Sequence, residues 1–599
     1  MGAAKERIDD ELAARTITYS RTQAKPDGGT SDLVERQHGQ VYHGVARMEA
    51  AAALLTTTKR WCFFSSIFVF SYIVGLDFMV RNTYVAYATS SFHNHSLLAT
   101  INVIRGVVAG AIQPSAARLA DVFGRVEIFC IAVFLITAGT LAETFSVNIE
   151  GFAGGAILHQ LGYTLSVMTI EIMIADFTAM KSRLFFSFVP NWPILVNTWI
   201  SGNVTSSVLS VTTWKWGIGM FAIMNPICAL PLIIFMLYLK RQARKANQSE
   251  EEALSPSRLR NLGQLFWDLD IIGVLILTSA LAMTLIPLTL AGGVKTKWKD
   301  AGIITPIVLG FLLIPVLLIW ERKISYPMLP YHLLKQRTVW ACLGISCLFP
   351  FIFVIHGNYL YTLLVVSYDF SIAGATRVAG LYNFCATLVG ATLGFLVIKF
   401  RRLKELIVIG AVMWFIGGGM VYHYRGGSSS KAGIIGAEIM IGSGAGFFSW
   451  TTYVLIQTAA RHEHLSILIS LIFTVNYFGQ AFGNCVSGAL WTQTLYEELD
   501  KNLVSFNNET LAAAVYASPF TVVPTYAIGT PEREAITESY RYIQRILTIT
   551  ALCLMVPMLA LALVLRNPRL SNQQTQPEAE QPGTSDQVEM RSKTGELAL

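Results

Sequence analysis

Long apolar stretches separated by short polar segments occupy nearly the whole chain. A helix rises 1.5 Å per residue, so about 20 apolar residues cross a hydrocarbon core about 30 Å thick. Scanning for such stretches predicts about fourteen transmembrane helices. They begin near Trp61, Leu97, Ile128, Gly151, Leu184, Trp216, Ile271, Ala301, Val339, Ala373, Leu406, Ala432, Leu465 and Ile546. The pattern predicts an all-α protein that crosses the membrane many times.

Composition supports this class. Apolar residues make up 53% of the chain and charged residues 14%, whereas soluble domains carry about 25% charged residues. The eight cysteines lie inside predicted spans without a C-x-x-C pair, so we expect packing roles. The sequence contains no recognisable set of catalytic residues, so we expect that the protein is not an enzyme and binds no cofactor or metal of its own.

Basic residues lie in short loops between the spans, which argues against a nucleic-acid partner.

Loop charge predicts the topology. Lys and Arg cluster after the even-numbered spans, which the positive-inside rule places in the cytoplasm together with both tails. The polar residues 1–57 and 569–599 are expected to be disordered tails. No apolar region precedes a cleavage site, so the first span should act as the insertion signal. Asn94 and Asn508 stand in glycosylation sequons of outward loops.

A charged interruption near residues 240–260 divides the spans. We expect a six-helix bundle at 58–240, a linker with two extra transmembrane helices at 241–336, and a second six-helix bundle at 337–568. Duplicated halves around a central site are a recurrent transporter plan. The outward loop at 496–541 is long enough to suggest a function, and Thr530 before Pro531 predicts a helix start there.

The loop after the second span carries a recognisable motif. Residues 117–126 read ARLADVFGRV and resemble the signature G-x-L-a-D-r-x-G-r-k of the major facilitator superfamily. Asp121, Gly124 and Arg125 match, whereas Ala117, Val122 and Val126 depart from it. The glycine allows a tight turn, and the charged pair could latch the cytoplasmic side. The resemblance implies the facilitator fold.

Longer stretches resemble the fungal siderophore-iron transporters of that superfamily, most of all the Mir-type carriers of moulds. They read GVARMEA (44–50), YATSSFHNHSLLATINVI (87–104), WKWGIGMFAI (214–223), FWDLDIIG (266–273), GALWTQTL (488–495), GTPEREAI (529–536) and SYRYIQRIL (539–547). The resemblance implies proton-coupled import of ferric siderophores, most often hydroxamates. We expect a plasma-membrane address, with a vacuolar or vesicular membrane as the alternative.

The residues inside the spans favour a neutral cargo. Only Arg81, Arg105 and Arg377 are clear basic candidates there, against many amides and tyrosines. A triply anionic chelate would call for clustered arginines, whereas an iron trihydroxamate needs amide, hydroxyl and aromatic partners. The cargo-binding candidates are Tyr84, His159, Tyr163, Asn191, His356, Tyr361, Arg377, Asn476, Gln480, Asn484, Tyr540 and Arg541.

Among these, Asn476, Gln480 and Asn484 recur every four residues and so share one helix face. Amides facing lipid are costly, so this stripe should point inward, where it lines a cavity or bonds a neighbouring helix.

Asp77, Arg81 and Tyr84 also share a face, in the first span. A charged group in the bilayer centre costs about 2.5–3.5 kcal/mol on an insertion scale, so this face should look inward. Asp77 paired with Arg81 is our first candidate for proton coupling, and a static packing pair is the alternative. Glu143, Glu171 and Glu438 are the next candidates.

Two other functions stay open at this point. A proton-driven drug exporter would have the same helix count, yet the fifth span lacks the G-x-x-x-G-P-x-x-G-G run of such exporters. A non-transporting siderophore receptor would share the ligand, yet we find no soluble signalling domain.

Overall fold

The computed structural model describes residues 56–92, 98–178, 180–246, 267, 270–291, 297–324, 334–425, 430–459, 465–506, 510–517 and 519–570. These ranges contain helices and connecting turns but no strand. Eleven of the described helical segments are long and apolar enough to cross a membrane. They contain α4, α6, α7, α10 with α11, α14, α15, α17 with α18, α19, α20, α21 and α25, whose bounds follow. The all-α membrane prediction is therefore confirmed.

The first group of helices comprises α4 (Thr57–Ser91), α5 (Leu98–Phe123), α6 (Arg125–Thr144), α7 (Ile149–Phe177), α8 (Met180–Ser187), α9 (Ile194–Val211), α10 (Trp214–Gly219) and α11 (Phe221–Ala246). Within it, α6 packs against α7 and α11, and α4 packs against α9 and α11. Two clusters of buried apolar side chains fill its interior.

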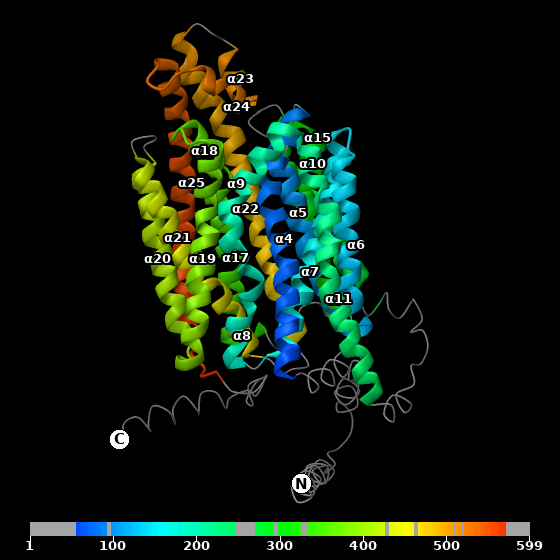
Figure 1. Cartoon of the computed structure of the whole chain (residues 1–599). Coiled ribbons are helices and arrows are strands. Elements are labelled where there is room, and N and C mark those ends of the chain that lie inside the picture. Colours follow the sequence, from blue (N-terminus) through cyan, green and yellow to red (C-terminus); the bar gives the residue numbers. More distant parts are fainter. Residues whose placement is uncertain are drawn as a thin grey trace, which may run out of the picture.

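The second group comprises α17 (Arg337–Gly357), α18 (Leu360–Val366), α19 (Ile372–Phe400), α20 (Lys404–Tyr424), α21 (Lys431–Gln457), α22 (Leu465–Leu503) and α25 (Pro531–Val564). Its largest contacts join α20 to α21, α17 to α22 and α19 to α21. The two groups lie side by side in Figure 1 and meet where α5 packs on α22 and α9 packs on α19.

Two further helices, α14 (Ile271–Ala291) and α15 (Ala301–Lys323), pack on each other, and α14 covers the seam between α5 and α22. Outward-facing apolar side chains dominate α15, as expected for a helix facing lipid. The domain boundaries that we expected around this pair stay a prediction, because residues 247–266 lie outside the described ranges.

Three expected spans, which form α5, α8 with α9, and α22, fall outside the eleven apolar segments. Helix α22 begins with an uncharged apolar segment and then carries the amide stripe. The fifth span is interrupted between α8 and α9 by a short 3-10 turn at Val189–Asn191, next to Pro190 and Pro193. Proline lacks the backbone N–H that would continue the helical ladder.

The region at 496–541 differs from the long loop that we expected. Helix α22 continues to Leu503 and α25 begins at Pro531, with the short helices α23 (Leu511–Ala517) and α24 (Pro519–Val522) between them. Figure 1 shows α23 and α24 at the end of the molecule where α22 and α25 extend past the other helices, and α23 packs on α22. The predicted helix start is confirmed, since the Thr530 side chain accepts a hydrogen bond from the backbone N–H of Arg533.

After α25, the chain packs back onto the bundle. The backbone N–H of Leu570 donates to the carbonyl of Arg401 (2.9 Å), and Leu570 is buried. Asn567 donates to Glu405 (2.6 Å). The expected disordered tails lie almost entirely outside the described residues, as do the sequons at Asn94 and Asn508.

Candidate functional site

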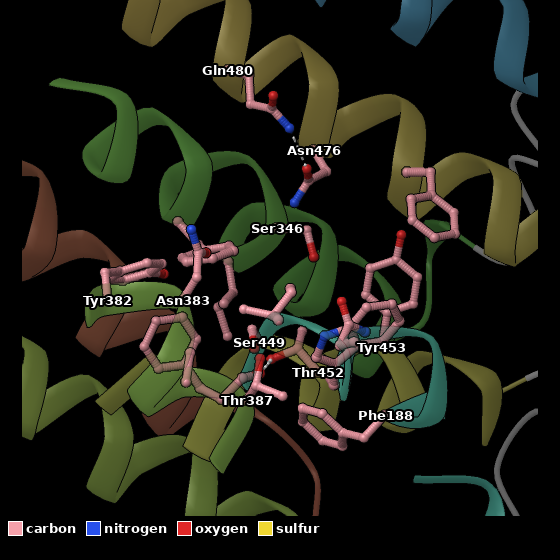
Figure 2. Close-up of a pocket in the computed structure, with 18 residues that line it drawn as sticks. Phe188, Ser346, Tyr382, Asn383, Thr387, Ser449, Thr452, Tyr453, Asn476 and Gln480 are labelled. Atoms are coloured by element: carbon pink, nitrogen blue, oxygen red, sulfur yellow. Dashed lines mark hydrogen bonds between the residues drawn. The ribbon is translucent and has the colours of Figure 1, made fainter. Parts of the chain in front are cut away.

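A cavity of about 280 Å³, here called the inner cavity, lies between α8–α9, α17, α19, α21 and α22. Figure 2 shows its lining side chains. Asn191, Ser346, Asn383, Asn476 and Gln480 contribute polar groups, and aromatic rings supply much of the rest. No Asp, Glu, Lys, Arg or His is among the described residues that line it. The wall can thus hydrogen-bond a ligand without offering it a charge.

The amide stripe on α22 serves both roles that we considered for it. Gln480 donates to the side-chain oxygen of Asn476 (2.9 Å), and both residues line the inner cavity. Asn484 lies one turn further along and accepts a hydrogen bond from Asn358 on the neighbouring α17–α18 segment (2.9 Å). Two of the three amides therefore face the cavity, and the third joins helices.

A second cavity of about 320 Å³, here called the outer cavity, lies toward the expected extracellular side. Residues of α4, α5, α17, α18 and α19 line it, and it carries the charged groups that the inner cavity lacks: Arg105, His356 and Glu438. His356 Nε2 lies 2.6 Å from Glu438 Oε1, and both residues are buried. Tyr361 lines this cavity as well.

Asp77 and Arg81 form the predicted pair, within a larger buried cluster in the first group of helices. Arg81 donates to both carboxylate oxygens of Asp77 (2.8 and 2.9 Å) and also bonds Glu143 of α6. Arg105 of α5 donates to the other oxygen of Glu143 (3.0 Å), and His159 of α7 lies 3.4 Å from Asp77. Each carboxylate is thus compensated by cations, as burial requires.

Two neutral side chains complete this charge cluster. Asn225 of α11 donates to Asp77 (3.3 Å), and Arg81 donates to the Thr140 hydroxyl (3.2 Å). Helices α4, α5, α6, α7 and α11 are thereby joined at one place. Arg105 is the member of the cluster that also lines the outer cavity, whereas Asp77 and Arg81 line neither cavity.

Several other predicted residues lie outside both cavities. Tyr84 is fully buried against Gly217, where a Cβ would come within 2.5 Å of its ring. Tyr163 stacks on Phe78 (centroids 6.0 Å apart). Glu171 is buried in α7 near Ser187.

The remaining cargo candidates are helix-joining or peripheral. Arg377 of α19 donates to Asn203 of α9 (3.2 Å), across the seam. Tyr540 is buried against Trp491 (centroids 5.5 Å apart), and Arg541 bonds Glu538 (3.2 Å). None of them is among the residues that line the two cavities.

At the expected cytoplasmic side, Gly124 adopts a left-handed φ of 109° between α5 and α6. Arg125 donates to Asp176 at the end of α7 (3.1 Å) and to the Ala120 carbonyl (3.0 Å), which latches this turn. Asp121 lies on α5, but its side chain is not among those that the structure describes. Nearby, the buried Arg183 of α8 donates to Gln457 at the end of α21 (2.8 Å), which joins the two groups of helices.

Sequence reasoning missed several cavity residues: Ser346, Tyr382, Asn383, Thr387, Trp450 and Tyr453. Ser, Thr, Tyr and Asn occur on every face of these helices, so no local pattern distinguishes them. The close approach of α19 and α21 could have been anticipated from Gly442 and Gly446, since small residues allow helices to pack tightly.

Comparison with known proteins identifies the family. The model of the Major Facilitator Superfamily matches residues 62–484. The chain belongs to this superfamily. The facilitator is 43% identical to siderophore iron transporter ARN1 of Saccharomyces cerevisiae, over 85% of this chain and 82% of the relative. It is 40% identical to siderophore iron transporter 1 of the same yeast (95% and 90%) and 31% identical to mirC of Emericella nidulans (94% and 93%). It is thus a multi-pass membrane transporter of the fungal siderophore-iron family.

Solved structures agree on the fold of this facilitator. A peptide transporter in complex with alafosfalin superposes with a TM-score of 0.52 at 13% identity, covering 87% of this chain and 99% of that one. A bacterial homologue of the human lysosomal transporter Spinster gives a TM-score of 0.51 at 12% identity, covering 85% and 98%.

Proposed function

We propose that this facilitator imports ferric siderophores of the neutral hydroxamate class across the plasma membrane, driven by the proton gradient. The charge-free inner cavity carries the proposal. An iron trihydroxamate presents carbonyl and hydroxamate oxygens without net charge, and amide, hydroxyl and aromatic groups recognise such a surface. The names of the relatives from yeast and Emericella nidulans support siderophore iron as the cargo.

Cavity size is compatible with alternating access. Ligand pockets have volumes of about 300–1,000 Å³; the outer cavity lies at the small end of this range, and the inner cavity lies just below it. Tyr382 and Asn383 line both, so the two cavities are neighbours on one path between the groups of helices. Rocking of one group against the other would join them into a larger space.

Proton coupling requires a group that can gain and lose a proton while it contacts the path. Among our five candidates, Glu438 is the carboxylate that lines a cavity, and His356 bonds it there. Asp77 is held by Arg81 and His159 away from both cavities, which favours the static role that we considered for it. We therefore place the coupling group at Glu438.

Uptake of labelled iron by a host without carriers of its own tests the cargo. We expect gradient-dependent accumulation of a neutral iron(III) trihydroxamate, at least about tenfold above that of a triply anionic iron(III) tris-catecholate, because an unpaired buried charge costs several kcal/mol. Host cells with an empty vector give the background, and a protonophore should abolish the signal.

Other outcomes would contradict the proposal. Equal uptake of both chelates would refute the neutral-cargo assignment. Export from preloaded cells would favour an exporter, and saturable binding without uptake would favour a receptor.

The tail beyond Leu570 should be dispensable for transport. A stop codon directly after Leu570 keeps the buried side chain and its bond to Arg401, so uptake per surface molecule should stay within about 20% of normal. A stop codon after Arg566 removes Leu570, whose burial stabilises by about 1.5–3 kcal/mol, and should lower the melting temperature of the purified protein. A large loss of uptake in the longer variant would contradict this expectation.

A further inference from the structure

Tyr382 of α19 lies where the two cavities meet. It lines the charge-free inner cavity and also the outer cavity that contains Glu438. Only Tyr382 and its neighbour Asn383 are common to the described linings of both. The two cavities therefore adjoin each other at this pair.

The Tyr382 ring is held firmly in place. It stacks on Phe353 of α17 (centroids 4.3 Å apart, interplanar angle 30°), and Trp414 of α20 lies 6.5 Å away. Its backbone is fixed as well: a Cβ at Gly442 of α21 would lie 2.6 Å from the Tyr382 carbonyl oxygen. Because α19 and α21 touch here, the backbone of Tyr382 cannot shift without moving a helix.

The hydroxyl on this ring has no hydrogen-bond partner in the described part of the chain. Tyr382 is only 4% exposed, and its hydroxyl oxygen has no hydrogen bond to any residue that the structure describes. Tyr453 of α21 repeats this arrangement in the inner cavity: it is 7% exposed, its ring packs on Phe473 (4.5 Å), and its hydroxyl likewise has no described partner. Figure 2 shows the two tyrosines on opposite sides of Ser346.

A buried hydroxyl without a partner is unfavourable, so its retention in a cavity wall calls for an explanation. We propose that the hydroxyls of Tyr382 and Tyr453 donate hydrogen bonds to oxygen atoms of the cargo, and that they select an uncharged, acceptor-rich chelate. This inference rests on the proposed function and adds two binding residues to it. A phenol hydroxyl suits a neutral oxygen acceptor, and its rigid ring needs little ordering when the ligand binds.

Binding to the purified full-length transporter tests this inference. The variants are Tyr382→Phe, Tyr453→Phe and their combination, and the probe is a neutral iron(III) trihydroxamate titrated by tryptophan fluorescence. Each single change should weaken Kd about five- to tenfold, the loss of one hydrogen bond, and the pair should multiply these factors. Tyr238→Phe is the matched control, since Tyr238 is 49% exposed on α11 and lines neither cavity.

Thermal stability separates a binding role from a structural one. Removing a partnerless buried hydroxyl should leave the Tm of the ligand-free protein unchanged or higher, while the rise in Tm caused by the chelate should shrink. A lower ligand-free Tm, or a Kd within twofold of the unchanged protein in both single variants, would overturn the inference. If the unchanged protein itself neither binds nor accumulates the chelate, the proposed function fails instead.

Discussion

Replacing Arg81 with methionine should prevent most of the protein from reaching the cell surface. Arg81 compensates two buried carboxylates, through two hydrogen bonds to Asp77 and one to Glu143. Methionine fills similar space but leaves both acids without this cation. Removing one partner of a buried ion pair costs about 3–5 kcal/mol, a large share of the usual 5–15 kcal/mol of stability. We expect surface abundance to fall to roughly a tenth, since 1–2 kcal/mol already changes abundance several-fold.

Surface labelling and the melting temperature of the purified protein measure this effect. Arg377→Met is the matched control, because Arg377 donates a hydrogen bond to the neutral Asn203 and is half-buried. Adding Asp77→Asn to Arg81→Met removes one uncompensated charge and should restore part of the stability, while Arg105 still pairs with Glu143 (3.0 Å). Normal surface abundance of Arg81→Met alone would show that the cluster is not structural.

Most of the fold could be predicted from the hydropathy pattern and the positions of proline and amide residues in the sequence. In lipid, an apolar segment of about twenty residues can satisfy its backbone N–H and C=O groups by forming a helix. The helices therefore occur where hydropathy predicts them. The interruption of the fifth span follows from Pro190 and Pro193. The inward direction of Asn476 and Gln480 follows from the cost of amides in lipid, and the structure confirms it.

Which side chains line a cavity could not be predicted in the same way. Asp77 and Glu438 are both carboxylates inside predicted spans, and each has a cationic or titratable neighbour. Which of them contacts the path depends on how helices pack across the molecule, and helical periodicity gives only the face of each helix. Asn484 illustrates this limit, because it shares its face with Gln480 and yet bonds Asn358 of another helix.

The coupling group can be assigned by a change that preserves shape. Glu438→Gln keeps the side-chain length and a hydrogen bond to His356 but cannot exchange a proton. The other titratable or charged side chains that line the same cavity are Arg105 from α5, Tyr359 at the start of α18, Tyr361 from α18 and Tyr382 from α19. All four remain in the variant, so the change isolates the carboxyl group.

One proton carried with a neutral cargo moves one positive charge inward. A potential of ~100 mV then supplies about 2.3 kcal/mol, enough for roughly fifty-fold accumulation. Glu438→Gln should reach the surface normally and reduce this ratio to about one, because cargo would equilibrate without a proton. Exchange of labelled for unlabelled iron(III) trihydroxamate across the membrane should survive, since the inner cavity is unchanged.

Two buried acids serve as comparators in the same assay. Glu171→Gln changes an acid that lines neither cavity, so accumulation should persist. Asp77→Asn leaves Arg81 bonded to Glu143, so it should lower stability more than coupling. If Asp77→Asn instead loses accumulation at normal surface abundance while Glu438→Gln still concentrates the chelate in a protonophore-sensitive way, the coupling acid is Asp77. Its pair with Arg81 would then have to open during transport, because a carboxylate held by two hydrogen bonds from a guanidinium keeps its charge throughout the cycle.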